Sequence, residues 1–265
     1  MNTLEKFNLD NTLSIVTGGA GMLGAKHVEA LLDAGSIVIV LDSSIKNIDK
    51  LNKDFNSNNK LHTFQIDISN EESVLRLKDK ISKKFESYPS ILINNAAIDP
   101  KVNEAEVKYD TFETFKLEKL SQEINVGLIG AVICTRVFGS DMAKNNKGVI
   151  LNISSDLGII APNQEIYGNS SKPVSYSIIK HGIIGLTRYT ATYWAKNGVR
   201  CNALAPGGIK NDQGEDFISK VEKLIPMNRM ADVDEYKATV VYMCSDASSY
   251  MNGAVVSVDG GRTSW

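Results

Sequence analysis

Tyr176 and Lys180 are the two side chains whose types and spacing first suggest chemistry. If the chain from Tyr176 to Trp194 forms a helix, an interval of four residues places both side chains on one helical face. A tyrosine with an ordinary pKa of about 10 is a poor base at neutral pH. A neighbouring ammonium favours the phenolate, so the pair predicts a general acid/base that exchanges a proton with an alcohol. A pair on a helix surface without a chemical role is the alternative.

A glycine-rich stretch near the N-terminus predicts a dinucleotide site. In Thr17 to Gly24, Gly19, Gly21 and Gly24 form G-x-G-x-x-G between an apolar run and a helical pattern. Glycine permits the tight turn and the approach of a pyrophosphate, and the start of the helix attracts its charge. Asp42 ends the next apolar run, where a carboxylate accepts from a ribose 2′-hydroxyl and repels a 2′-phosphate. We therefore expect NAD(H) in preference to NADP(H), with capping of the next helix by Asp42 as the alternative.

Seven short apolar runs must position these groups. Strands are expected over Leu13–Thr17, Ile37–Leu41, Leu61–Ile66, Ile91–Ile93, Val149–Ile153, Val199–Ala203 and Val255–Val258. Between the first two runs, Met22–Ala34 has helical spacing and Gly35 ends the helix. Strands that are apolar throughout and alternate with helices imply a parallel sheet covered on both faces. The expected fold is α/β, a Rossmann-like, doubly wound, seven-stranded parallel sheet in three layers, with residues 1–265 as one domain.

Two polar stretches interrupt the alternation, and each follows an expected strand. Asp99–Lys119 and Ala161–Ser175 are both expected to be loops near the ligand, because open α/β sheets bind ligands beyond the carboxyl ends of their strands. Residues 162–173 are polar and include Tyr167 and Lys172. Such a segment suits a sugar, sugar phosphate or nucleotide sugar better than a steroid or fatty-acyl chain. A solvated loop is the alternative.

Composition excludes several other classes of protein. The 29 basic and 31 acidic residues nearly balance, so neither nucleic acid nor a membrane surface is expected as a partner. No apolar run has the length of a membrane span, and the N-terminus lacks a signal-peptide pattern, so we expect a cytoplasmic protein. The cysteines lack metal-ligand spacing, so no metal is expected; they are Cys134, Cys201 and Cys244. The histidines are expected to be structural; they are His27, His62 and His181.

Taken in order along nearly the whole chain, these motifs resemble those of the short-chain dehydrogenases/reductases, in their single-domain branch. Met22 and Ala97 stand where that family usually has glycine. The resemblance implies that Asn125 holds a proton-relay water, that Ser155 orients the substrate oxygen, and that Tyr176 and Lys180 complete the catalytic set. It implies cofactor contacts from Gly18, Gly19, Gly21, Met22, Leu23, Gly24, Asp42, Asp67, Ile68, Asn95, Ala96, Ala97, Tyr176, Lys180, Pro206, Gly207 and Ile209.

The same resemblance implies further features of the assembly and the pocket. Residues 207–224 are expected to form a mobile lid over a small-molecule substrate. A homodimer or homotetramer is expected, with helices around Asn125–Ala143 and Ser175–Trp194 in the larger interface and the C-terminal strand in another. A weaker resemblance links the C-terminal part to dehydrogenases of bacterial surface-sugar and flagellin-modification pathways.

Three functions are compatible with these residues. The first is an NAD(H)-dependent alcohol/ketone oxidoreductase, which the presence of the whole catalytic set favours. The second is a sugar epimerase or dehydratase of the extended branch, for which the chain lacks room for a further substrate domain. The third is a non-catalytic dinucleotide-binding regulator, since a fold does not fix a function.

Overall fold

A seven-stranded parallel sheet forms the centre of the molecule, in the order β3-β2-β1-β4-β5-β6-β7. The computed structural model describes all residues except 1, 57, 99–110 and 169. The strands are β1 (Leu13–Thr17), β2 (Ile37–Asp42), β3 (Leu61–Gln65), β4 (Ile91–Asn94), β5 (Gly148–Ile153), β6 (Val199–Pro206) and β7 (Val255–Val258). The strand order reverses between β1 and β4, which is where doubly wound sheets bind ligands.

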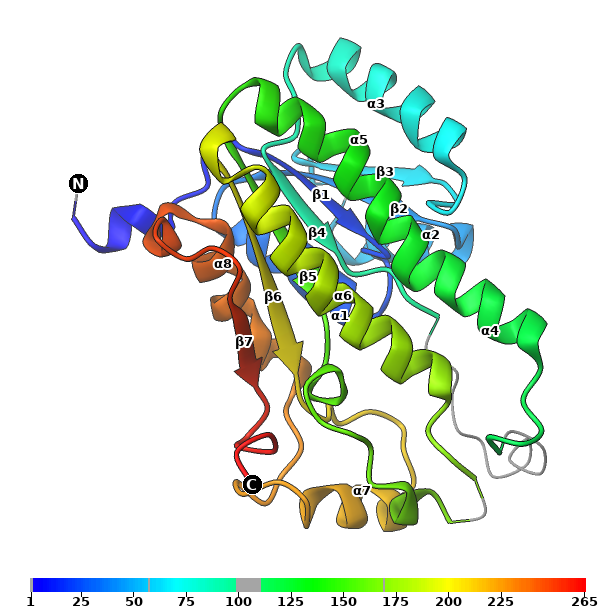
Figure 1. Cartoon of the computed structure of the whole chain (residues 1–265). Coiled ribbons are helices and arrows are strands. Elements are labelled where there is room, and N and C mark those ends of the chain that lie inside the picture. The colour runs from blue at the N-terminus through cyan, green and yellow to red at the C-terminus, as the bar shows by residue number, and fades with distance from the viewer. Residues whose placement is uncertain (1, 57, 99–110, 169) are drawn as a thin grey trace.

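Helices cover both faces of this sheet (Figure 1). They are α1 (Met22–Asp33), α2 (Ile45–Asp54), α3 (Glu71–Phe85), α4 (Leu117–Ile124), α5 (Gly130–Lys144), α6 (Val174–Tyr193), α7 (Glu215–Glu222) and α8 (Lys237–Cys244). Helices α3, α5 and α6 pack on one face, and α1, α2 and α8 on the other. Helix α7 lies beyond the carboxyl ends of the strands. The expected three-layer, doubly wound α/β fold with seven parallel strands is confirmed.

Alternate residues of the central strands build two separate cores. Ile15 of β1 and Ile39 of β2 point into the core under α3 and α5. Val16 and Val40 point into the core under α1 and α8. All five residues of β1 are buried, whereas β7 at the sheet edge has none buried. The continuous apolar runs of the sequence therefore reflect burial on both faces.

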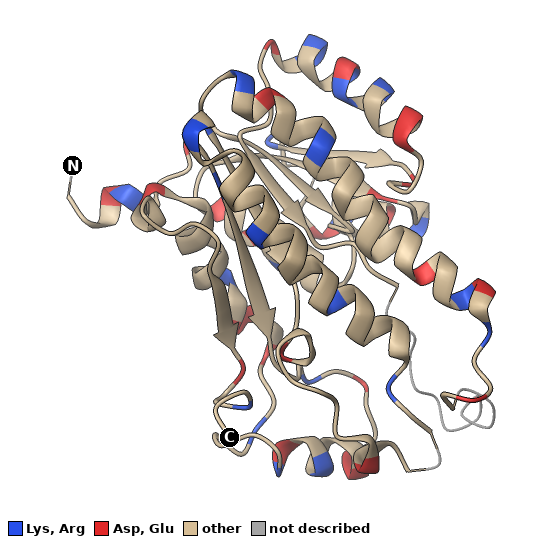
Figure 2. Ribbon diagram, viewed as in Figure 1, with Lys and Arg blue, Asp and Glu red and all other residues tan. Residues whose placement is uncertain are grey.

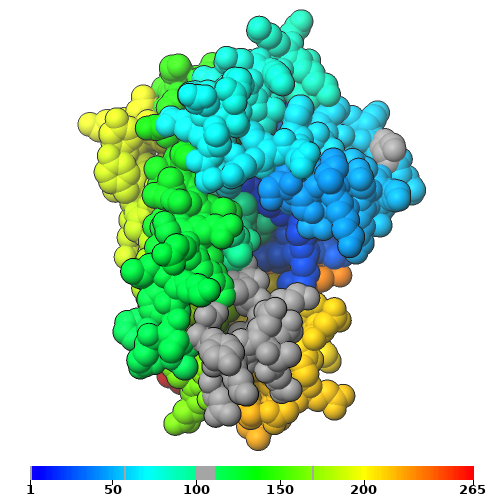
Figure 3. Space-filling model, turned by 90° about the vertical axis from the view of Figure 1, so that its right-hand side faces the viewer, coloured from blue at the N-terminus to red at the C-terminus, as the bar shows by residue number. Residues whose placement is uncertain are grey.

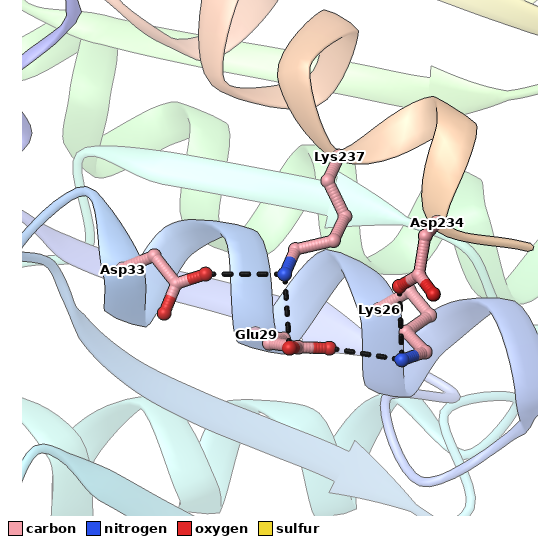
Figure 4. A network of polar contacts seen from close by, with 5 residues as sticks. All are labelled: Lys26, Glu29, Asp33, Asp234 and Lys237. Atoms are coloured by element: carbon pink, nitrogen blue, oxygen red, sulfur yellow. Dashed lines mark hydrogen bonds and ion pairs between the residues drawn. The ribbon is translucent and has the colours of Figure 1, made fainter.

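A network of charged side chains ties α1 to the segment that begins α8 (Figure 4). Lys237 Nζ lies 2.9 Å from Glu29 and 3.1 Å from Asp33, and Lys26 Nζ lies 2.9 Å from Asp234 and 3.1 Å from Glu29. The ammonium of Lys237 lowers the pKa of Glu29. These side chains are 25–65% exposed, so water screens each pair.

The expected loops are only partly irregular. Residues 99–110 of the stretch Asp99–Lys119 lie outside the described residues, and Leu117–Lys119 form the first turn of α4 instead of a loop. In the stretch Ala161–Ser175, a short 3-10 helix spans Gln164–Tyr167, and the last two residues already belong to α6. Pro173 directly precedes α6, and its fixed φ suits the start of a helix.

One helix in the described part of the chain has the length and composition of a membrane span, which the sequence analysis did not expect. It is Leu117–Lys144, formed by α4, a π-helical turn at Asn125–Ile129, and α5. Within its most apolar window, 61% is buried inside the protein. Apolar residues of its α5 part pack in the core between this helix and the sheet.

Candidate active site

The turn between β1 and α1 leaves no room for a side chain at two of its glycines. Gly18 has φ of +60°, and a Cβ there would lie 2.8 Å from the Cα of Ala96. At Gly24 a Cβ would lie 2.1 Å from the carbonyl oxygen of Gly18. At Gly21 the nearest atom would be 3.3 Å away. The close approach of β1, α1 and the segment after β4 therefore depends on Gly18 and Gly24.

Side chains from β1 and the end of β4 hold this turn in place. Thr17 Oγ1 accepts hydrogen bonds from the N–H groups of Asn95 and Ala96, at 3.0 and 3.1 Å. Asn95 Nδ2 donates to the carbonyl oxygens of Thr17 and Gly18, both at 3.0 Å. The segment after β4 is thereby fixed against the glycine turn, at the point where the strand order reverses.

Asp42 binds the same turn from the end of β2. Its Oδ2 accepts from the N–H of Ala20 at 3.1 Å, and its Oδ1 accepts from the N–H of Ser44 at 2.9 Å. The N-cap of α2 is Ser44, whose hydroxyl accepts from Asn47. The alternative in which Asp42 caps the next helix is therefore wrong. A carboxylate has about four acceptor positions, so Asp42 can accept further hydrogen bonds from a ligand.

A cleft of about 600 Å³ opens at these strand ends. Figure 3 shows the surface hollowed between the N-terminal segments in blue and the helix in green. With the exception of Gly19, every cofactor residue expected from the sequence lines it: Gly18, Gly21, Met22, Leu23, Gly24, Asp42, Asp67, Ile68, Asn95, Ala96, Ala97, Tyr176, Lys180, Pro206, Gly207 and Ile209. Gly19 lies against β2, where a Cβ would be 3.0 Å from a methyl group of Val40.

Tyr176 and Lys180 lie one turn apart on α6 and face this cleft. Lys180 is buried, and its ammonium donates to the carbonyl oxygen of Ile153 at 2.9 Å. That ammonium lies 5.6 Å from the centre of the Tyr176 ring. The hydroxyl of Ser154 donates to the carbonyl oxygen of Lys180 at 2.8 Å, which fastens α6 to the end of β5. The helix and strand thus hold a cation beside the phenol.

Ser155 completes this group at the end of β5, with an acidic neighbour that the sequence analysis missed. Its hydroxyl donates to Asp156 Oδ1 at 2.7 Å, and the N–H of Leu157 donates to the same oxygen at 2.7 Å. Burial raises the pKa of the Asp156 carboxyl, although these two hydrogen bonds act in the opposite direction. The signal was present in the sequence, because Asp156 directly follows the expected catalytic serine.

Asn125 does not line the cleft with the other three expected catalytic residues. It is exposed and lines a shallow hollow with Asp67 and Gln122. Its carbonyl oxygen accepts from the N–H of Gly130 in the π-helical turn. Gln122 and Val126, four residues apart on the same helix, line the cleft instead. Gln122 and Val126 are four residues apart, so helical periodicity in the sequence could have predicted that they share a face.

Two segments beyond the strand ends touch each other near the cleft. The rings of Tyr167 and Phe217 lie 5.6 Å apart, so the 3-10 helix of residues 164–167 packs on α7. Ile209, at the start of the expected lid, forms an isolated bridge with Ala231. Segment 162–173 and the expected lid are thus in contact.

Comparison with known proteins identifies the family of this chain. Residues 19–263 match a family model described as enoyl-(acyl carrier protein) reductase. The chain is 30% identical to 2-dehydro-3-deoxy-D-gluconate 5-dehydrogenase of Bacillus subtilis, over 97% of this chain and 96% of the relative. It is 29% identical to post-translational flagellin modification protein A of Campylobacter coli, over 96% of this chain and 98% of the relative. The protein belongs to the short-chain dehydrogenases/reductases.

The fold is shared with solved structures across the whole chain. A short-chain dehydrogenase from Leptospira borgpetersenii with bound NAD+ superposes with a TM-score of 0.86, at 30% identity, over 99% of this chain and 96% of that chain. Solved structures of this fold also include a complex with NADP. The protein is therefore an oxidoreductase of a family that acts on CH–OH groups with nicotinamide dinucleotides.

Proposed function

We propose that this protein is an NAD(H)-dependent dehydrogenase that interconverts an alcohol and a ketone, with Tyr176 as the general acid/base. The supporting observation is that Tyr176, Lys180 and Ser155 border the same cleft as the glycine turn and Asp42. A non-catalytic regulator needs only the dinucleotide half of this cleft.

The residues of the cleft fit a dinucleotide. The backbone at Gly18 and Gly24 leaves the turn without side chains, and α1 directs its positive N-terminus toward the region where phosphates would bind. The nicotinamide, when bound, exchanges a hydride with the substrate carbon. Pro206, Gly207 and Ile209 would border it on the side of β6.

The proton moves through Tyr176 in this proposal. In the direction of oxidation, the phenolate takes the proton of the substrate hydroxyl, and in reduction the phenol returns it. Lys180 stabilises the phenolate through its positive charge. Ser155 holds the substrate oxygen beside the tyrosine. Asn125 remains the proposed site of a relay water, a role that needs a water molecule to bridge it to the cleft.

The preference for NAD(H) rests on Asp42. Its carboxylate is fixed by two backbone N–H groups at the end of β2. A fixed negative charge accepts hydrogen bonds from the ribose 2′-hydroxyl and repels a 2′-phosphate. The neighbouring Ser43 and Ser44 offer no positive charge to a 2′-phosphate.

The substrate is proposed to be polar, with residues 207–224 acting as a lid on a single domain of residues 1–265. Segment 162–173 is rich in hydrogen-bonding groups and packs on α7 through Tyr167 and Phe217. The named relatives from Bacillus subtilis and Campylobacter coli act on a sugar acid derivative and in flagellin modification, respectively. A sugar, sugar phosphate or nucleotide sugar fits these observations.

A cytoplasmic homodimer or homotetramer is proposed as the working form. The π-helical turn, α5 and α6 carry large apolar side chains that are 38–65% exposed: Ile129, Val132, Ile178, Tyr189 and Tyr193. Such a face is suited to burial against a second copy of the chain.

The test combines a cofactor titration with a turnover screen. NADH and NADPH are titrated by fluorescence, and ketoses, sugar phosphates and nucleotide sugars are then screened for a change in absorbance at 340 nm. We expect tighter binding of NADH and turnover with at least one sugar. Tight NADH binding without turnover on any of them would favour the regulator.

A further inference from the structure

Helix α7, in the middle of the expected lid, buries very little of its own surface. None of its eight residues, all of which the structure describes, is buried. Acidic and basic residues both lie along it (Figure 2), and Phe217, Ile218 and Val221 are only half-buried. An element with so little buried apolar surface opens at a low cost in free energy. The position of α7 therefore depends on the segments that precede and follow it.

The segment before α7 lies on the end of β7. The N–H of Gly207 donates to the carbonyl oxygen of Val258 at 3.0 Å, and a Cβ at Gly207 would lie 2.7 Å from the Cα of Asp259. A Cβ at Gly208 would lie 3.2 Å from a methyl group of Val221, so α7 packs on the next residue of this segment. Because Gly207 also lines the cofactor cleft, α7 is joined directly to the wall of that cleft.

The segment after α7 is held by residues that follow β7. The N–H of Met227 donates to the carbonyl oxygen of Gly260 at 3.1 Å. Gly260 has φ of +63°, and a Cβ there would lie 2.6 Å from a methyl group of Ile225. The indole N–H of Trp265 donates to the carbonyl oxygen of Leu224 at 3.1 Å. Both flanks of α7 thus rest on the end of β7 and the residues that directly follow it.

Residues 259–265, here named the C-terminal turn, are themselves fixed by one carboxylate. Asp259 Oδ1 accepts from the N–H of Gly261 at 2.9 Å, and Oδ2 accepts from the N–H and the hydroxyl of Thr263 at 2.9 and 2.6 Å. Three hydrogen bonds to one charged group close the turn without help from α7. Trp265 is 73% exposed, so its contact with the segment after α7 depends more on the indole N–H than on buried area.

We propose that the C-terminal turn is the fixed base of the substrate lid and that Trp265 is a positioning residue, which holds α7 through Leu224. Leu224 does not line the cofactor cleft, so loss of its hydrogen bond weakens binding of the substrate under the lid more than binding of the dinucleotide. This inference rests on the proposed function and deepens it, because it assigns the residues that set how firmly the lid of residues 207–224 closes.

Hydrogen–deuterium exchange measures this anchoring without requiring turnover. The variants are Trp265→Phe, which keeps an aromatic ring and removes the N–H donor, and Asp259→Ala, which opens the C-terminal turn. Tyr250→Phe is the matched control, because Tyr250 is fully exposed and loses only a hydroxyl. Exchange is followed in residues 211–227 and, as an internal reference, in α6. KM, kcat and the Kd of NADH are measured for the same proteins.

Exchange in residues 211–227 should be about fivefold faster in Trp265→Phe, the factor for one hydrogen bond of ordinary strength, and faster still in Asp259→Ala. Exchange in α6, and all exchange in Tyr250→Phe, should stay unchanged. KM for the substrate should rise by a similar factor in Trp265→Phe, while kcat and the Kd of NADH stay within about twofold. Unchanged exchange in Trp265→Phe, or an unchanged KM despite faster exchange, would overturn the proposal. Faster exchange without turnover of any sugar would contradict the proposed dehydrogenase activity and leave the anchoring of α7 standing.

Discussion

Replacement of Asp42 by asparagine tests the basis of the cofactor preference. The Asp42 carboxylate accepts one hydrogen bond from the N–H of Ala20 and one from the N–H of Ser44. Its remaining acceptor positions can bind the ribose hydroxyls. Asparagine has one acceptor oxygen, so it cannot keep both backbone bonds and also bind the ribose. Loss of one charge-assisted hydrogen bond costs about 1.5 to 3 kcal/mol, or roughly 10- to 150-fold in the Kd of NADH.

The same change should weaken the binding of NADPH less than that of NADH. Two like unit charges 4 Å apart repel by about 1 kcal/mol even in water, and the phosphate carries up to two charges. Removal of the carboxylate should therefore offset most of the lost hydrogen bonding, so the ratio of the two Kd values shifts at least about 10-fold toward NADPH. The assay is fluorescence titration of both cofactors, with Asp49→Asn on the exposed face of α2 as the control. Equal weakening of NADH and NADPH, together with a lower Tm, would show that Asp42 only braces the glycine turn.

Three further changes test other parts of the structure. His27 is fully buried, neither ring nitrogen has a hydrogen-bond partner among the described residues, and burial lowers its pKa to about 3. The unfolded chain therefore binds a proton between about pH 6.5 and 3 that the folded protein does not, so stability falls as pH falls through this window. The free energy of unfolding, measured with urea, should fall between pH 7 and pH 5 by about 2 kcal/mol less in His27→Leu than in the wild-type protein. An equal fall in both proteins would contradict this. Asp156→Ala should lower kcat/KM about 10-fold without changing the Kd of NADH, because Ser155 loses its acceptor, and an unchanged kcat/KM would exclude that role. Lys237→Gln should lower the free energy of unfolding by no more than about 1 kcal/mol and less in 1 M salt; a larger, salt-independent loss would mean that the network is not screened.

Local patterns in the sequence were sufficient to predict the strands of the sheet and most residues that line the cleft. The apolar runs locate all seven strands, because each strand is short and flanked by polar or turn residues. The glycine turn, Asp42 and Tyr176 could be predicted because each needs only a residue type at a known distance from a strand or helix end. Gly19 is the exception within the turn, since its position against Val40 depends on the packing of β2.

The features that the sequence did not predict depend on contacts between distant segments. A cavity of about 300 Å³ forms where α4, segment 162–173 and α6 meet, and no single stretch of sequence contains it. Asn125, expected to hold a relay water near Lys180, begins a π-helical turn and is exposed. The acceptor role of Asp156 and the position of Lys172 over Tyr176 likewise follow from side-chain geometry.

Turnover of the Tyr176→Phe variant tests the central claim most directly. Phenylalanine keeps the ring beside Lys172 and Lys180 and removes only the hydroxyl that would carry the proton. With the sugar that the wild-type protein reduces, we predict that kcat falls by about 10²- to 10⁴-fold while the Kd of NADH stays within about twofold. A variant that keeps wild-type kcat would contradict the assignment of Tyr176 as the general acid/base.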